Sequence, residues 1–222
     1  PIPPPPPFNL LPVTDISLLI RDPYAVYAKR VLDLRPLNPL RPEPDPALRG
    51  QTLHSIVEAL LRTKPGPTTP PEALKAEFLR ITAEVLETEV PWPAARAFWQ
   101  ARMERIADQI VADELARLAQ GQPVVIEKRG RVAVAGMDFT LMAKPDRIDL
   151  LHDGQAVIYD YKSGTPPTDA QIRHFDKQLV LEAAIARRGG FSELGPVDVA
   201  GIRYIQLGGE GKTQARDHSD VL

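Results

Sequence analysis

The sequence predicts an α/β (α+β) domain in which a mixed central β-sheet is flanked by helices and preceded by a helical region. Two observations carry this prediction. The first half of the chain, to about residue 120, has the apolar period of amphipathic helices. From Val124 onward, short runs of β-branched and aromatic residues alternate with glycine-containing turns, and one more helix and strand follow. The last strand is expected to return beside an earlier one through a right-handed crossover.

Start signals define the helices of the first half. Asp45-Pro46 is an N-cap and first-turn pair, and the apolar stripe that follows predicts a helix to about residue 62. Thr69 and Glu72 have the spacing of a capping box, which predicts the start of another helix. The remaining helical segments are a long one over 92–118 and one or two short ones within 14–34.

Three runs predict the strands of a meander: VVIEKRGRVAVAG, FTLMAKPDRIDLL and QAVIYDYK. Thr168 and Gln171 form a second capping-box pattern, and the helix that they open is expected to end at Gly189-Gly190. The run VDVAGIRYIQL, residues 197–207, predicts the final strand.

Composition divides the chain into three segments. The opening PIPPPPP predicts a proline-rich linker over residues 1–12, and with it a domain that belongs to a longer protein. Residues 13–207 are expected to form one domain, with a helical part over 13–120 and a sheet core over 121–207. Residues 208–222 are polar and predict a frayed tail, whose GGEGKT run lacks the first glycine of a phosphate-binding loop.

Composition also narrows the chemistry. The 222 residues are 43% hydrophobic and 25% charged, as is ordinary for a globular protein, and no apolar run reaches membrane-spanning length. The chain has no cysteine, so disulfides, thiolate zinc sites and iron–sulfur clusters are excluded within these residues. Any metal must bind oxygen or imidazole ligands, which suits Mg²⁺ or Mn²⁺. The net charge of −2 gives no overall footprint for nonspecific nucleic-acid binding.

The segment AKPDRID and the strand VIYDYKSG hold the most informative residues. Alternate residues of a strand share a face, so Asp160 and Lys162 are expected on one side and Tyr159 and Tyr161 on the other. If the intervening turn closes a hairpin, Asp146 comes near Asp160. This arrangement predicts a carboxylate pair for a divalent metal with an ammonium group beside it. The alternative is an Asp160–Lys162 ion pair that is solvated at a sheet edge.

Landmarks of one kind of enzyme stand in order along the chain. They are the helix pair Gly50-x-x-x-His54, then Asp146, the strand triplet Asp160-Tyr161-Lys162 and the helix pair Gln178-Leu179. This order resembles the PD-(D/E)xK nuclease superfamily in its RecB-like branch, over nearly the whole chain. It is most similar to the C-terminal nuclease domain of AddB proteins of the alphaproteobacterial type. The resemblance implies a restriction-endonuclease-like core.

The resemblance implies a deoxyribonuclease that depends on Mg²⁺ or Mn²⁺. Lys162 would orient the attacking water or neutralise charge on the phosphate. Gln178 would contact nucleic acid or the lysine, while Glu182 stands where many relatives have a tyrosine. The implied catalytic residues are Asp146, Asp160, Lys162 and Gln178. The implied metal ligands are His54, Asp146, Asp160 and the backbone carbonyl of Tyr161.

Simpler interpretations stay open for several residues. His54 could be a partly buried helix histidine, with Glu58 orienting it or facing solvent. Glu127, in the first strand, could reach the site or face water. Pro145 has no backbone donor, which predicts an edge or a kink in its strand.

By the same resemblance, the expected partners are single-stranded DNA, an AddA-type helicase–nuclease subunit and a helicase-like region upstream in the same polypeptide. The expected setting is exonucleolytic processing during double-strand break repair in the bacterial cytoplasm. Two other function classes stay open. One is an inactive nuclease fold that guides DNA or docks a subunit, and the other is a carboxylate-metal phosphatase for small molecules.

Many AddB relatives close this domain with an iron–sulfur cluster, whose first cysteine precedes a Pro-Tyr pair near the N-terminus. Asp22 takes that place here, before Pro23-Tyr24. The N-terminal helices are therefore expected to dock through apolar contacts. The candidate residues are Leu18, Leu19, Tyr24 and Tyr27.

Overall fold

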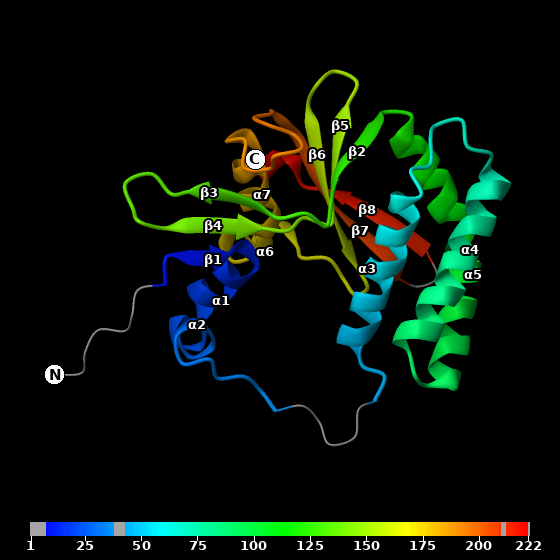
Figure 1. Cartoon of the computed structure of the whole chain (residues 1–222), viewed down its shortest axis with the longest axis horizontal. Coiled ribbons are helices and arrows are strands. Elements are labelled where there is room, and N and C mark those ends of the chain that lie inside the picture. Colours follow the sequence, from blue (N-terminus) through cyan, green and yellow to red (C-terminus); the bar gives the residue numbers. More distant parts are fainter. Residues whose placement is uncertain (1–7, 38–42, 210–211, 222) are drawn as a thin grey trace.

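The computed structural model describes residues 8–37, 43–209 and 212–221. Two sheets form its centre (Figure 1). The larger has five strands in the order β2-β5-β6-β7-β8, and the smaller has three in the order β1-β4-β3. In the larger sheet β6 and β7 are parallel, whereas the other neighbours are antiparallel. The predicted fold class, a mixed sheet flanked by helices, is confirmed.

The strands are β1 (Leu10–Pro12), β2 (Gly121–Ile126), β3 (Gly130–Ala133), β4 (Thr140–Ala143), β5 (Arg147–Leu151), β6 (Ala156–Lys162), β7 (Val199–Gly209) and β8 (Lys212–Asp217). The helices are α1 (Ile16–Arg21), α2 (Pro23–Arg30), α3 (Pro46–Arg62), α4 (Pro71–Glu89), α5 (Pro93–Leu118), α6 (Asp169–His174) and α7 (Gln178–Arg187). Two short 3-10 turns are η1 (Val13–Asp15) and η2 (Ser219–Val221). Among the described residues, no helix has the length and apolar character needed to cross a membrane.

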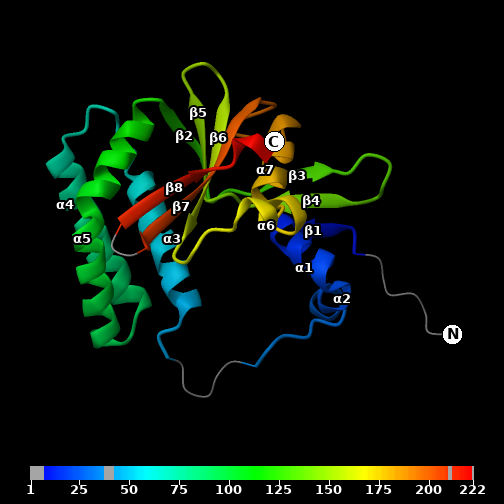
Figure 2. The same ribbon diagram turned by 180° about the vertical axis from the view of Figure 1, so that it is seen from behind.

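Helices cover both faces of the larger sheet, with α3, α4 and α5 on one side and α7 on the other (Figures 1 and 2). Side chains alternate along β6. Tyr159 and Tyr161 pack into the core beneath α3–α5, whereas Ile158 packs into the core beneath α7. Asp160 therefore points toward the α7 side, as the strand period predicts.

Two capping-box predictions have different outcomes. Thr168 and Gln171 do form the reciprocal box at the start of α6. The box expected from Thr69 and Glu72 is wrong, because α4 starts at Pro71 without a side-chain cap. The Thr69 hydroxyl instead accepts a hydrogen bond from the Gly66 amide, at 2.9 Å, within the preceding turn.

The helix expected between Thr168 and Gly189 is broken into α6 and α7. Phe175 leaves the helical conformation at φ −133°, and α7 begins three residues later. Asp176, in the break, accepts a hydrogen bond from the Tyr204 hydroxyl at 3.3 Å. The break places Gln178 in the first turn of α7, where its side chain points back at the sheet.

Both ends of the described chain are more ordered than composition predicts. Leu10–Pro12 pair in parallel with β4, and Leu11 is fully buried, so the linker interpretation is wrong for these residues. The frayed tail is wrong for Lys212–Asp217, which pair with β7 as the edge strand β8. Backbone hydrogen bonds hold an edge strand without an apolar period, and polar side chains suit an edge. Residues 1–7, 210–211 and 222 lie outside the described parts. The division of 13–207 at residue 120 stays a prediction.

The N-terminal helices dock differently from the expectation. Tyr24 is 69% exposed, while Leu18, Leu19 and Tyr27 are only partly buried. Val26 is the one fully buried apolar residue of α2. Ion pairs add to this contact, because buried Asp15 meets Lys29 Nζ at 2.8 Å and Arg30 Nε at 2.7 Å.

Candidate active site

The candidate site lies where the chain passes from the small sheet into the large one. Lys144, Pro145 and Asp146 connect β4 to β5. Pro145 stands outside both strands, so its missing donor interrupts no ladder. The β5–β6 register pairs Arg147 with Tyr159, which sets the preceding Asp146 opposite Asp160. The hairpin therefore brings the two carboxylates together, as predicted.

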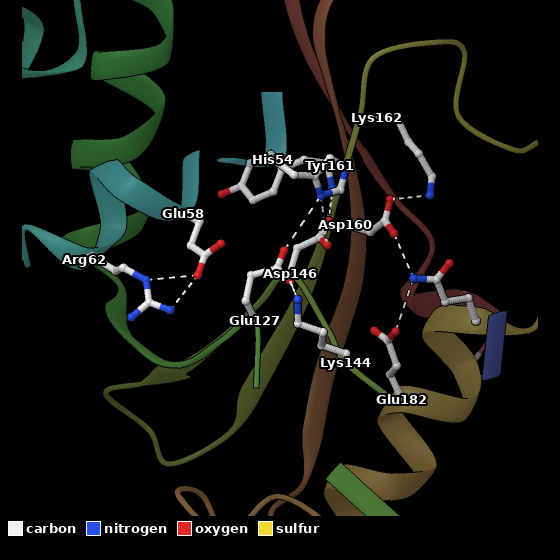
Figure 3. A network of polar contacts seen from close by, with 11 residues as sticks. His54, Glu58, Arg62, Glu127, Lys144, Asp146, Asp160, Tyr161, Lys162 and Glu182 are labelled. Carbon is white, nitrogen blue, oxygen red and sulfur yellow. Dashed lines mark hydrogen bonds and ion pairs between the residues drawn. The ribbon is translucent and has the colours of Figure 1, made fainter. Parts of the chain in front are cut away.

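Asp146 connects three elements through one carboxylate. Its Oδ1 lies 3.1 Å from His54 Nδ1 on α3 (Figure 3). Its Oδ2 accepts a hydrogen bond from the Tyr161 amide of β6, at 2.8 Å. These contacts fix the carboxylate between helix and sheet.

Glu127 joins this pair from the end of β2. Its Oε1 lies 3.9 Å from His54 Nδ1 and its Oε2 lies 2.5 Å from Lys144 Nζ. The backbone of Glu127 is left-handed at φ 53°, a conformation that costs a non-glycine residue about 1 kcal/mol or more. Its amide is held by the Pro145 carbonyl at 3.1 Å. One donor atom each from His54, Glu127 and Asp146 falls within 4.8 Å of the others.

Asp160 forms the other half of the site with Lys162, whose Nζ lies 2.7 Å from Asp160 Oδ2. Gln178 donates from Nε2 to Asp160 Oδ1 at 2.9 Å and to Glu182 Oε1 at 3.2 Å. Asp160 is 2% exposed on a strand that has neighbours on both sides. The alternative is therefore correct about the Asp160–Lys162 ion pair but wrong about its place, because Asp160 is buried on an inner strand.

Burial shapes the protonation of both carboxyl groups on this side. Desolvation and the nearby charge of Asp146 raise the pKa of Asp160 to about 6. Burial and the charges of Asp160 and Asp146 raise the pKa of Glu182 well above its ordinary value. Glu182 Oε2 is also buried without a hydrogen-bond partner.

The His54 side of the site attracts positive charge. Burial opposes an imidazolium ion, but hydrogen bonds to Asp146 and Glu127 outweigh it and raise the pKa of His54 to about 10. Glu58 takes no part, because it pairs with Arg62 at 2.5 Å (Figure 3). Of the two interpretations left open for Glu58, the one in which it orients His54 is wrong.

A buried network supports the site from below. Arg147, next to Asp146, is fully buried. Its guanidinium meets Glu114 of α5 and Asp149 of β5, each at 2.6 Å, and the Tyr161 hydroxyl at 3.2 Å. Arg117 also meets Glu114, at 2.9 Å, so two guanidinium groups face two carboxylates beneath the backbone that carries Asp146.

Comparison with known proteins identifies this arrangement. The sequence profile of the PD-(D/E)XK nuclease superfamily matches residues 11–221. The chain belongs to this superfamily. It is 27% identical over 187 residues to an uncharacterized protein of Rickettsia bellii, which covers 83% of the chain and 22% of the relative. It is 26% identical over 221 residues to one of Rickettsia felis, with 94% and 26% covered. The chain thus spans about a quarter of the length of these relatives.

The donor set of this PD-(D/E)XK domain fits a divalent metal. Nucleases of the superfamily use such ions. One imidazole and two carboxylates, from His54, Glu127 and Asp146, form a nitrogen and oxygen donor set that could hold a divalent metal. The Tyr161 amide is bound to Asp146, while its carbonyl as a ligand stays a prediction.

The superfamily motif pointed to Asp160, Lys162 and Gln178, and the structure brings all three together. The motif does not include Glu127, which the sequence offered only as a first-strand acid that could reach the site or face water. The distinctive feature of Glu127 is its left-handed backbone at the end of a strand. The sequence does not reveal this conformation, because an acidic residue in a strand-like run gives no sign of its backbone dihedral angles.

Proposed function

We propose that this chain is a metal-dependent deoxyribonuclease that hydrolyses phosphodiester bonds of single-stranded DNA. The observation that carries the proposal is the convergence of His54, Glu127 and Asp146 within 4.8 Å, beside strand β6, which carries Asp160 and Lys162. Carboxylates gathered beside an ammonium group match the needs of phosphoryl chemistry, in which charge develops on the phosphate oxygens.

His54, Glu127, Asp146 and Asp160 would hold Mg²⁺ or Mn²⁺, with the Tyr161 carbonyl as a further ligand. When bound, such an ion lowers the pKa of a water nucleophile and offsets charge on the scissile phosphate. Lys162 would orient the attacking water from its position beside Asp160. Gln178 would keep the Asp160 carboxylate aligned through its 2.9 Å hydrogen bond.

The proposed biological setting is that of an AddB-type nuclease domain in bacterial double-strand break repair. It would digest, as an exonuclease, strands that a helicase-like region and an AddA-type partner unwind in the cytoplasm. The order of the motifs from His54 to Gln178 supports this setting. The greater length of the relatives is compatible with it.

The test is cleavage of an end-labelled single-stranded oligonucleotide in Mg²⁺ or Mn²⁺ buffer. Lys162→Ala and Asp160→Asn should each reduce the rate by about 100-fold or more, as does loss of one preorganised electrostatic group. Lys75→Ala is the matched control, since Lys75 pairs with Asp108 at 2.6 Å on the outer helices. Equal cleavage by the parent and by Lys162→Ala would refute the assignment.

One observation favours a second candidate, an inactive nuclease fold that guides DNA. Glu182 adds a second buried carboxyl group beside Asp160, where a tyrosine is expected. This candidate predicts no binding of Mn²⁺ at millimolar concentration. Heat from calorimetric titration of Mn²⁺ into the protein, lost in Asp146→Asn, would exclude it.

A further inference from the structure

An open groove of about 1080 Å³ lies between the C-terminal end of α3 and the strand β2. Both of these elements reach the same end of the molecule (Figures 1 and 2). Arg62, the turn 64–67 and β2 line the groove, and the apolar side chains of Leu150 and Leu151 complete it. Sites for small ligands typically measure about 300–1,000 Å³, so this groove has room for part of a polymer. We call it the β2 groove.

The β2 groove reaches the candidate active site along both of its walls. On one wall, Ile126 and Lys128 line the groove, and Glu127 of the site stands between them in the chain. On the other wall, Arg62 follows His54 by eight residues of α3, so the two side chains lie on the same flank of the helix (Figure 3). A chain of nucleotides in the groove therefore leads to the carboxylates.

The β2 groove is basic. Among the described residues that line it, Arg62, Lys64 and Lys128 are positively charged and none is acidic. Arg62 meets Glu58 at 2.5 Å and Lys128 meets Glu193 at 2.7 Å, both as exposed ion pairs, which are weak enough to exchange for another anion. Within the described ranges, Lys64 forms no ion pair with a carboxylate. The charge of the lining thus favours a polyanion, although the whole chain carries −2.

The backbone of Lys64 is a second, independent observation. Lys64 is left-handed at φ 55° and directly follows Thr63, the C-cap of α3. Glycine is the residue that most often takes this place after a helix, because a side chain is unfavourable there. Unfavourable backbone conformations of this kind cluster at ligand-binding sites. The lysine therefore stands where local stability alone would favour glycine.

The strand wall of the groove offers backbone donors. Within the described residues, β2 pairs only with β5 and forms an edge of the larger sheet. Backbone N–H groups of such an edge can donate to phosphate oxygens. An added peptide strand would use the same edge, but a lining with basic side chains and no acid favours nucleic acid.

Resting on the proposed nuclease function, we infer that the β2 groove binds a single DNA strand and guides it to the metal site. Arg62, Lys64 and Lys128 bind backbone phosphates, and bases lie against the apolar lining. The strand from Gly121 to Ile126 is roughly 17 Å long, which matches about five stacked nucleotides at 3.4 Å each.

Binding is measured without cleavage, by fluorescence anisotropy of a labelled oligothymidylate in EDTA buffer over a series of KCl concentrations. Each lost phosphate contact should flatten the plot of log affinity against log salt by about 0.7, and loss of all three by about 2. The variants are Lys64→Gln and the triple variant Arg62→Gln, Lys64→Gln, Lys128→Gln. Arg188→Gln is the matched control, because Arg188 is exposed after α7 on the opposite face of the larger sheet.

Two further variants separate binding from folding. Lys64→Gly should flatten the slope as much as Lys64→Gln, yet unfold at the same or a higher urea concentration, because glycine suits the left-handed position. Gln122→Lys adds a cation to the exposed edge of β2 and should steepen the slope by about 0.7. A misfolded protein gives neither result.

No binding by the parent protein overturns the inference, and so does an unchanged slope in Lys64→Gly and the triple variant. Equal displacement of the labelled strand by a blunt duplex overturns its preference for a single strand. The cleavage assay separates the two proposals. A parent that cuts DNA while these variants keep its slope refutes the groove only. A parent that never cuts while the slope flattens refutes the nuclease and leaves a DNA-binding groove.

Discussion

Gln178 connects Asp160 to Glu182, through hydrogen bonds of 2.9 Å and 3.2 Å from a single amide nitrogen. Both carboxyl groups are buried. The side-chain amide of Gln178 thus donates to two carboxyl groups and aligns them. Its position follows from the break before α7, which turns the first helical residue toward β6.

Removal of this connection should impair the site without touching a metal donor. Gln178→Ala should lower the cleavage rate by about 10-fold to 100-fold, because groups that orient ligands typically contribute that much. Gln178→Glu should be worse, since it adds a carboxylate to two others. Steady-state cleavage of a labelled strand measures the effect, with Gln155→Ala in the exposed β5–β6 turn as the control. Full activity in Gln178→Ala would show that cleavage does not depend on the hydrogen bond from Gln178 to Asp160.

Glu182→Gln should stabilise the protein at alkaline pH. The folded-state pKa of Glu182 is raised above the ordinary 4.5, so the native state binds the extra proton. The free energy of unfolding therefore falls as the pH rises from about 4.5 through the folded pKa. Glutamine keeps the contact with Gln178 and removes this loss, so a gain of about 1–3 kcal/mol is expected at pH 8.

Urea unfolding of metal-free protein at pH 5 and pH 8 measures this gain. The exposed Glu87→Gln of α4 is the control and should change stability little at either pH. An equal effect of Glu182→Gln at both pH values would contradict the raised pKa.

Mn²⁺ binding should release a proton from His54. The pKa of His54 is about 10 without a cation, and a metal ligand must be deprotonated. Apparent affinity should therefore rise by about tenfold per pH unit between roughly pH 7 and 10. Calorimetric titration of Mn²⁺ in two buffers of different ionisation enthalpy gives the number of protons released on binding. This release should be lost in His54→Ala. The exposed His174→Ala is the control, and proton release that survives in His54→Ala would exclude His54 as its source.

Arg147→Ala should destabilise the fold by about 3–5 kcal/mol, because it removes the guanidinium group that pairs with buried Asp149 and one of the two that pair with buried Glu114. Arg80→Ala is the matched surface control. Arg80 also meets two acids, but it is half exposed, so its loss should destabilise the fold far less than the loss of Arg147. Chemical unfolding compares the two, and similar values would mean that solvent reaches the Arg147 network.

The signals that the sequence could give were local ones. The alternation that separates Tyr161 from Asp160, the Asp45-Pro46 start of α3 and the Thr168 capping box all depend on residues within one strand or one turn. The capping box at Thr69 failed because proline at the first helical position fixes the start of α4 by itself. The polar strand β8 gave no apolar period, since its pairing uses the backbone.

By itself the sequence determined the order of the site motifs, the facing of Asp160 and Lys162, and the absence of cysteine chemistry. Only the tertiary structure decided that Glu127 meets His54, that Glu58 turns away to Arg62, and that Glu182 is buried beside Asp160. The physical reason is that the protonation state and the partners of a side chain depend on its burial and on charged residues that are distant in the sequence but adjacent in the fold. The left-handed backbone of Glu127 at the end of β2 and the break before α7 help to position Glu127 and Glu182. Neither feature leaves a periodic pattern in the sequence.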